Sequence, residues 1–349
     1  MSGKLKILAR KVSFLGVALL FVAQSFAQVN KDALNGIMEQ RAKALKNNAT
    51  TFAAGNKDSL FYKYDAKTFN IYRGQGYAGY ISELFTTALV LTLVDEGKIS
   101  LDDKIVQYLP SYAKYGKNYI TIRHCLTHNT GIQVPSKLVF FEKSKFSSLE
   151  DEVNSFAAKD IQTNPGEEFR YNDRGFLIAA RIAEIVTKKK FDNIILQRLF
   201  RPLGMRQTTF QTLDGTQTNP AFGARTTSAD MMTFLQMLLN KGTFQGQHFL
   251  SENSIMELRK ISAVATRMNN APKELAGLDY TLGTWAPEQK DNIASVLVSP
   301  SYGGTIAVVD FCRGYAYVYL QKELTDDPKL SMYNSIKPIL DEYNPSTCK

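Results

Sequence analysis

The chain has 349 residues, of which 44% are hydrophobic and 21% are charged, a composition that excludes disordered, collagen-like and coiled-coil proteins. Its formal net charge of +9 comes from 42 basic and 33 acidic residues. The basic residues are dispersed, whereas a nucleic-acid-binding protein would show clustered stripes of lysine and arginine. We therefore expect a globular chain of one large or two modest domains, with no nucleic-acid partner.

The first 27 residues have the three-part pattern of a secretory signal peptide. Lys4–Lys11 is basic, Val12–Ala23 is apolar, and Ser25 and Ala27 are the small residues that precede a cleavage point. The apolar stretch is shorter than the ~20 residues that span a bilayer, which favours cleavage near Ala27 over an uncleaved anchor. No later stretch reaches transmembrane length, so we predict a mature chain of 28–349 that is periplasmic or secreted.

The three cysteines are Cys125, Cys312 and Cys348. A scaffold stapled by disulfides would need more of them, and a chain of this length can bury a core without any. One bridge with a leftover thiol and three reduced thiols both remain open.

The predicted elements change in type along the chain. Asn30 can cap a first helix, and residues 59–64 read as a strand that follows a turn. Helical spacing of apolar residues then dominates, over 81–94 with Gly97 as its end, 121–131, 176–186 and, capped by Ser228, 231–239. Strand patterns follow at 280–285, 294–298, 305–310 and 315–321, and a last helix is predicted at about 328–342.

Strands at both ends of a helical middle predict an α+β fold. We expect a single domain over 28–349. Its α/β part would comprise 28–78 and 265–349, and its mainly helical part 79–264.

Several segments, in order, resemble the class C β-lactamases and penicillin-binding-protein-like serine hydrolases. Residues 85–88 and 93–103 are similar to the family's nucleophile helix, 120–131 to its next signature, and 165–171 to the approach to its second motif. Residues 201–205 and 228–230 are also family-like. The resemblance implies a β-lactamase/DD-peptidase-like fold, in which an antiparallel sheet flanked by helices packs on an all-helical region. The active site would lie between them.

The resemblance also implies a set of catalytic motifs. Ser-x-x-Lys places both side chains on one helical face, because three residues turn about 300°. The serine attacks a lactam, peptide or ester carbonyl, and the lysine helps to take its proton. Tyr-x-Asn supplies a second proton relay. Lys- or His-x-Gly on a strand adds a cation and an oxyanion-hole N–H.

Most of these positions are substituted in this chain. The serine position falls on Tyr80 and the lysine position on Glu83. A phenol of pKa ~10 is a poor nucleophile, and a neighbouring carboxylate raises that pKa further. The second motif keeps Tyr171 but has Asp173 in place of asparagine. The third aligns, to within about two residues, with Ser299 and its successors, and lacks the cation and the glycine.

Other candidate sites are weaker. Ser82 lies about 200° around the helix from position 80, which predicts a packed or capping hydroxyl. His124 and His128 have zinc-like spacing, but no glutamate or third ligand accompanies them, so we expect no metal. His248 is isolated and expected at the surface. The glycines at 303–304 precede no helix, which argues against phosphate binding, and no cofactor is expected.

Three functions remain in competition. The chain could be a pseudoenzyme that binds a ligand or partner, an active periplasmic serine hydrolase (β-lactamase, DD-peptidase or esterase) with an atypical site, or an interaction module with a vestigial cleft. The first is favoured because only Tyr171 matches the motif side chains. Glu83 and Ser299 replace two cations, and Asp173 replaces a neutral asparagine. We therefore expect a neutral or cationic small molecule, or a cell-envelope component, as the partner.

Overall fold

A computed structural model describes residues 29–45, 49–66, 69–134, 146–211, 218–264, 268–301, 304–322, 325 and 329–348. The predicted signal peptide lies outside these residues. Within the described ranges, no helix combines the length and the apolar character that a membrane crossing requires.

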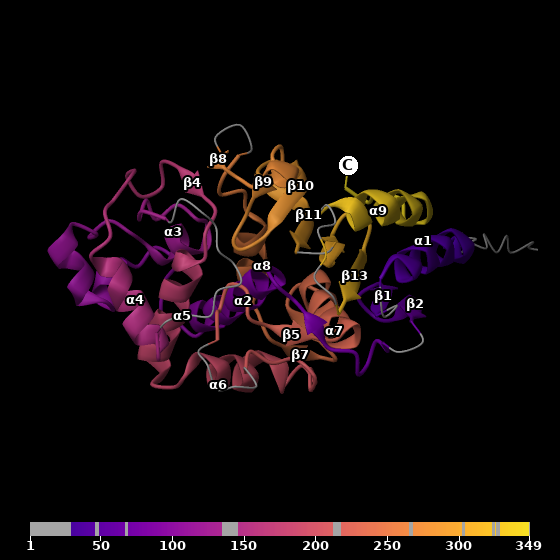
Figure 1. Cartoon of the computed structure of the whole chain (residues 1–349), viewed down its shortest axis with the longest axis horizontal. Helices are drawn as coiled ribbons and strands as arrows, with labels where there is room; N and C mark the ends of the chain where they lie inside the picture. Colours follow the sequence, from indigo (N-terminus) through magenta and orange to yellow (C-terminus); the bar gives the residue numbers. More distant parts are fainter. Residues whose placement is uncertain are drawn as a thin grey trace, which may run out of the picture.

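The core of the fold is a seven-stranded antiparallel sheet with the strand order β2-β1-β13-β12-β11-β10-β9 (Figure 1). The strands are β1 Thr50–Gly55, β2 Leu60–Asp65, β9 Asp279–Tyr280, β10 Trp285–Lys290, β11 Ile293–Pro300, β12 Ile306–Asp310 and β13 Tyr315–Gln321. The predicted α+β class is confirmed. The predicted strand over 280–285 is wrong, because a turn in which Thr281 N–H donates to Thr284 O separates β9 from β10.

Helices cover both faces of the sheet. Alternate residues of a strand point to opposite faces, and Ala53 and Val318 belong to one apolar cluster whereas Phe52 and Tyr317 belong to another. The first cluster includes α7 (Ser228–Leu239), and the second includes α1 (Lys31–Ala44) and α9 (Ser331–Tyr343). Double-sided burial explains why β12 and β13 are buried at every position.

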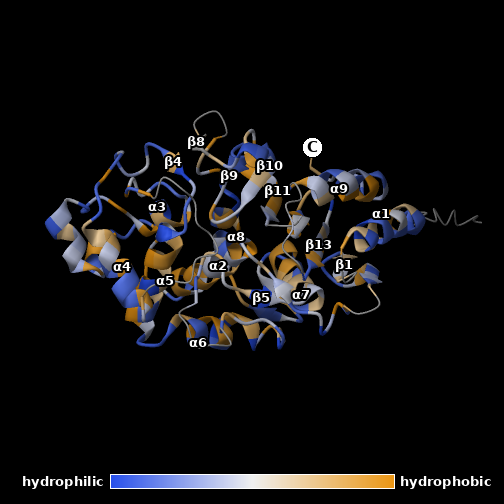
Figure 2. Ribbon diagram, in the orientation of Figure 1, coloured by the Kyte–Doolittle hydropathy of each residue, from blue (hydrophilic) through white to orange (hydrophobic). Residues whose placement is uncertain are grey.

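Helix α2 (Ile81–Asp95) carries the candidate residue Glu83. It lies between the sheet and the helical region. Every residue from Ile81 to Leu93 is buried, and Figure 2 shows this apolar helix in the middle of the molecule. It packs on β11, on α8 (Glu252–Arg259) and on α5 (Arg174–Thr187). The start of α2 therefore lies where the sheet and the helical region meet.

The helical region is arranged around α5. Its other members are η1 Ile105–Gln107, η2 Pro110–Tyr115, α3 Ile122–Leu126, α4 Leu149–Ala157, α6 Phe191–Ile195 and η3 Leu196–Phe200. Short strand pairs complete the fold: β3 Gly76–Tyr77 with β5 Arg225–Thr226, β4 Phe169–Arg170 with β8 Met268–Asn270, and β6 Thr243–Phe244 with β7 Gln247–His248.

Two predicted helix boundaries are wrong. The helix that follows Thr121 ends at Leu126, five residues before Gly131. The cap of α7 is Thr227, whose side chain accepts from Asp230 N–H, and not Ser228. The Ser228 hydroxyl instead contacts Thr51 Oγ1 of β1 at 2.6 Å, so it ties α7 to the sheet.

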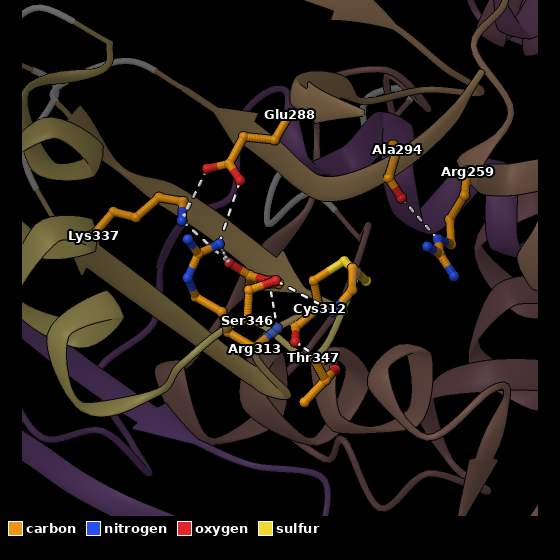
Figure 3. Close-up of a disulfide and its surroundings, with 10 residues drawn as sticks. Arg259, Glu288, Ala294, Cys312, Arg313, Lys337, Ser346 and Thr347 are labelled. Atoms are coloured by element: carbon orange, nitrogen blue, oxygen red, sulfur yellow. Dashed lines mark hydrogen bonds and ion pairs between the residues drawn. A yellow bond between two sulfur atoms is a disulfide. The ribbon is translucent and has the colours of Figure 1, made fainter. Parts of the chain in front are cut away.

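The cysteines form one bridge and leave one thiol. Cys312 and Cys348 are bonded, and Cys125 is free and buried. Thr347 reinforces the bridge, because its N–H and its hydroxyl both donate to Cys312 O at 2.7 Å (Figure 3). Thr347 and Cys348 are thus fixed to the turn between β12 and β13. Next to the bridge, Lys337 of α9 contacts Asp310 of β12 and Glu288 of β10, which attaches α9 to the sheet, and it also pairs with Asp341 of its own helix.

Removing the bridge should lower the free energy of unfolding. The bridged residues are 36 apart in sequence. Closing a loop of this size lowers the entropy of the unfolded chain and stabilises the fold by roughly 3–4 kcal/mol. We expect that loss for the Cys312→Ser/Cys348→Ser variant in urea unfolding. Wild-type protein unfolded with a thiol reductant should match the variant. A difference from oxidised wild type below about 1 kcal/mol would contradict this account.

Candidate active site

The first and third motif positions meet at the start of α2. Tyr80 precedes the helix, and its backbone N–H donates to Ser301 Oγ at 3.2 Å, directly after the end of β11. Gly79 makes this approach possible, since its φ is +56° and a Cβ there would lie 1.9 Å from Ser301 Oγ. The backbone N–H of Tyr80 is thus already hydrogen-bonded to the Ser301 hydroxyl.

Glu83 lies one turn further along α2 and is only 2% exposed. Its Oε2 accepts hydrogen bonds from Tyr171 at 3.2 Å and from Tyr280 at 3.1 Å. Burial raises the pKa of the Glu83 carboxyl, and this effect exceeds the opposing influence of His128 and the two tyrosines. The lysine position of the family motif is therefore taken by a carboxyl group that tends to hold its proton.

His128 also belongs to this network, and its Nε2 lies 3.6 Å from Glu83 Oε2. Its Nδ1 accepts from Asn172 N–H at 3.4 Å, and its Nε2 lies 2.9 Å from the Tyr280 hydroxyl. An Nδ1 that accepts places the ring proton on Nε2, which then donates to the Tyr280 hydroxyl, and Tyr280 in turn donates to Glu83. The result is a buried chain of hydrogen bonds from a backbone amide to the Glu83 carboxyl.

The two histidines therefore serve separate purposes. His124 Nδ1 accepts from Thr121 N–H and completes the cap of α3, whereas His128 lies beyond the end of that helix with φ +55°. Among the residues that the structure describes, no group of three His, Cys, Asp or Glu side chains could hold a metal ion. Sequence reasoning placed His128 in a family-like segment and tested it as a metal ligand, but it missed the contact of His128 with Glu83.

Aromatic rings fill the space around Tyr80. Its ring packs edge-on against Tyr171 at 5.3 Å and against Phe222 at 5.2 Å between centroids, and Tyr80 is 5% exposed. The ammonium of Lys329 lies 5.4 Å from the Tyr80 ring centroid. Burial lowers the pKa of Lys329, although Glu274 and Glu83 oppose this. No sequence motif pointed to Lys329, so the site has a cation that the motif analysis did not find.

The remaining predicted residues have partners of their own. The Asp173 carboxylate accepts from Asn219 Nδ2 at 3.0 Å, and the Ser299 hydroxyl lies 2.8 Å from Thr284 Oγ1. Ser82 Oγ accepts from Ala224 N–H at 3.0 Å inside the protein, which confirms the prediction of a packed hydroxyl. Of the five predicted positions, direct contacts join Tyr80, Glu83 and Tyr171 into one cluster.

Comparisons with known proteins agree with this fold. Residues 81–333 match the family described as Beta-lactamase, beginning directly after Tyr80. "Protein flp" of Staphylococcus aureus strain MW2 is 28% identical over 147 residues, which cover 41% of this chain and 29% of that protein. A protein of Escherichia coli K12 named "Putative D-alanyl-D-alanine carboxypeptidase" is 29% identical over 146 residues, 38% of this chain and 33% of that one.

The chain thus spans about a third of the length of these curated relatives. A solved structure titled "putative beta-lactamase from Bacteroides dorei DSM 17855" superposes with a TM-score of 0.79 at 19% identity, covering 90% of this chain and 99% of that one. The architecture is therefore shared over nearly all of both chains.

Proposed function

Because the chain belongs to the β-lactamase family, we propose that it is an exported member in which the hydrolase site no longer performs covalent catalysis. The observation that carries the proposal is the pair at positions 80 and 83. A buried phenol ring stands where the nucleophile would be, and a buried carboxyl group, held by two tyrosines, stands where its lysine base would be.

The geometry around Tyr80 opposes nucleophilic attack. A reacting carbonyl must come within about 3–3.5 Å of the nucleophile, but Tyr171 and Phe222 pack against the Tyr80 ring. The Lys329 ammonium faces this ring, where it forms a cation–π contact. The site therefore offers a substrate no exposed nucleophile at position 80.

The site is also poorly arranged to stabilise the negative charge that develops on a carbonyl oxygen during acyl transfer. Acyl-transfer enzymes hold the oxyanion with backbone N–H groups, often including that of the nucleophile itself. In this chain the N–H of Tyr80 already donates to Ser301 Oγ. An incoming carbonyl oxygen would have to displace that hydroxyl.

The nature of the site favours a neutral or cationic small molecule, or a cell-envelope component, as partner. Asp173 contributes a negative charge, and neither position 83 nor position 299 carries the cation of the family motif. The raised pKa of Glu83 and the half-buried ammonium of Lys329 offset part of the negative charge, which favours a neutral ligand over a strongly cationic one. A ligand with a carboxylate would lack the two cations of the family site. Export is supported by the three-part pattern of the first 27 residues and by the Cys312–Cys348 bridge, since disulfides persist in oxidising compartments.

The proposal is tested by intact-mass measurement of protein recovered from the cell envelope after incubation with a reactive penicillin. We expect the mass of the chain that begins at Gln28, with no penicilloyl adduct. An active serine β-lactamase treated in parallel is the positive control. An adduct on the wild-type chain would overturn the loss of catalysis, and retention of residues 1–27 would overturn cleavage after Ala27. Thermal shift with cell-envelope fragments then separates a ligand-binding protein from a vestigial fold.

A further inference from the structure

A second surface, remote from Tyr80, combines exposed tyrosines with lysines. Tyr115 is 51% exposed and Tyr119 is 70% exposed. Both belong to the segment 104–119, which includes η1 and η2 and packs on α4. In Figure 1 the violet segment beside α4 lies at the end of the molecule opposite α1. We call Lys104, Lys114, Tyr115, Lys117 and Tyr119 the tyrosine–lysine surface.

A lysine ammonium lies over one face of each tyrosine ring of this surface. The Lys117 ammonium lies 5.6 Å from the Tyr115 ring centroid, and its side chain is buried with a hydrogen bond of 2.6 Å to Lys159 O. The Lys104 ammonium lies 5.6 Å from the Tyr119 ring centroid. Such cation–π contacts favour one position of the ring, and both rings remain at least half exposed. Two exposed rings are thus presented in defined positions.

The spacing and charge of the surface define a ligand class. Tyr119 follows Tyr115 by four positions, so their α-carbons lie at most about 14 Å apart, a span that neighbouring sugar units of a polysaccharide can cover. Residues 104–119 contain three lysines and no acidic residue. Acidic residues border this segment. Asp102 pairs with Arg123, Asp103 accepts from Tyr108, and Asp160 faces Lys117. The first turn of α4 carries Glu150, which pairs with Arg181, together with Asp151 and Glu152.

We propose that the tyrosine–lysine surface binds an acidic polysaccharide. The apolar C–H faces of sugar rings stack on Tyr115 and Tyr119, while Lys104 and Lys114 attract the carboxylates of the chain. This proposal stands independently of what happens at Tyr80, because the two surfaces share no residue.

The composition of the surface argues against two other partners. A segment that enters a lipid interface presents large apolar side chains, but Ala113 is the single aliphatic residue in 113–119. Single-stranded nucleic acid requires a groove of free cations along its backbone. Here the Lys117 ammonium is buried against a carbonyl, which leaves Lys104 and Lys114 exposed in this segment.

The test is affinity electrophoresis of the mature chain in native gels that contain polygalacturonate, an acidic polysaccharide, or dextran, a neutral one. We expect retardation by polygalacturonate alone, weakened about tenfold in apparent affinity by Tyr115→Ala/Tyr119→Ala. Tyr72→Ala is the matched control, since Tyr72 is 52% exposed and lies under Lys63 but belongs to another part of the chain. Lys104→Gln should weaken binding and reduce its dependence on salt.

Several results would overturn the proposal. These are equal retardation by dextran, no retardation by either polymer, or the same loss for Tyr72→Ala as for the double variant. Co-sedimentation with phosphatidylglycerol vesicles that the double variant abolishes, without polysaccharide binding, would assign the surface to lipid instead. Thermal unfolding of every variant identifies any loss of polysaccharide binding that comes from misfolding. Since penicillin reactivity is measured at Tyr80, the two proposals can fail separately.

Discussion

Neither Tyr80→Ser nor Glu83→Lys alone should give a covalent adduct with a reactive penicillin, and the double variant should be acylated slowly with little turnover. The serine alone would still have a carboxyl group as neighbour, and the lysine alone would have a phenol. Catalytic groups act as a unit, so single repairs recover little activity. The double variant restores a serine and a lysine on one face of α2.

Adding Ser301→Gly should accelerate acylation of the double variant by roughly a hundredfold. The change frees the N–H at position 80 from the hydroxyl that it now binds, and one oxyanion-hole donor is worth about 10²–10³ in rate. Time-resolved adduct mass measures the effect. Asp173 and Ser299 remain substituted in this variant, so we expect deacylation to stay slow.

Two controls make this series interpretable. Ser82→Ala in the triple variant should leave the adduct unchanged, because the Ser82 hydroxyl is bound to Ala224 N–H. Thermal unfolding of each variant is needed because Glu83→Lys places an ammonium among Tyr171, Tyr280 and His128. An adduct that maps to Ser82 would show that the assignment of the α2 face is wrong. Equal rates for the double and triple variants would show that Ser301 does not block the donor.

Glu83→Gln should stabilise the fold at alkaline pH, and Glu83→Ala should destabilise it at every pH. Burial raises the pKa of Glu83 above its unfolded value, so the folded state binds more protons than the unfolded state. The contribution of this group to stability is therefore complete below the unfolded pKa and is lost as pH rises through the folded pKa. Glutamine cannot lose a proton and keeps an oxygen that accepts from both tyrosines.

We expect an advantage on the order of 1 kcal/mol for Glu83→Gln at pH 8 that shrinks toward pH 4. Glu83→Ala leaves two buried tyrosine hydroxyls without their acceptor and should cost about 2–4 kcal/mol. Urea unfolding from pH 4 to pH 9 measures both, with the exposed Glu342→Gln as the control. If the wild type gains stability relative to Glu83→Gln as pH rises, the Glu83 carboxylate is charged and stabilising, contrary to our account.

Local patterns explain why much of the fold was predictable. The apolar spacing in α2 and α5 and the β-branched and aromatic run of β13 are strong local signals, and the observed bounds of β13 equal the predicted ones. β1 was missed because all six of its residues are buried, which removes the alternation that marks a half-exposed strand. The turn between β9 and β10 was also missed, because the sequence pattern over 280–285 is that of one continuous strand.

The substitutions at positions 80 and 83 could be predicted because they lie within a short motif. Their partners could not, since Tyr280, His128 and Lys329 come from distant segments that the tertiary fold brings together. Ser301 illustrates the limit: its alignment to the third motif predicted a lost glycine. The structure is needed to show that Ser301 lies close to Gly79 and that its hydroxyl accepts from the N–H of Tyr80.

The position of β1 in the sheet has a consequence for biosynthesis. β1 lies between β2 and β13, pairing Thr50 with Gln321, so one of its edges stays open until residues 315–321 have been synthesised. Contacts this distant close slowly, and an open strand edge is a site for aggregation. A nascent chain that ends before β13 should therefore depend on chaperones, and a truncation there would remove the partner of β1 and not merely shorten the domain.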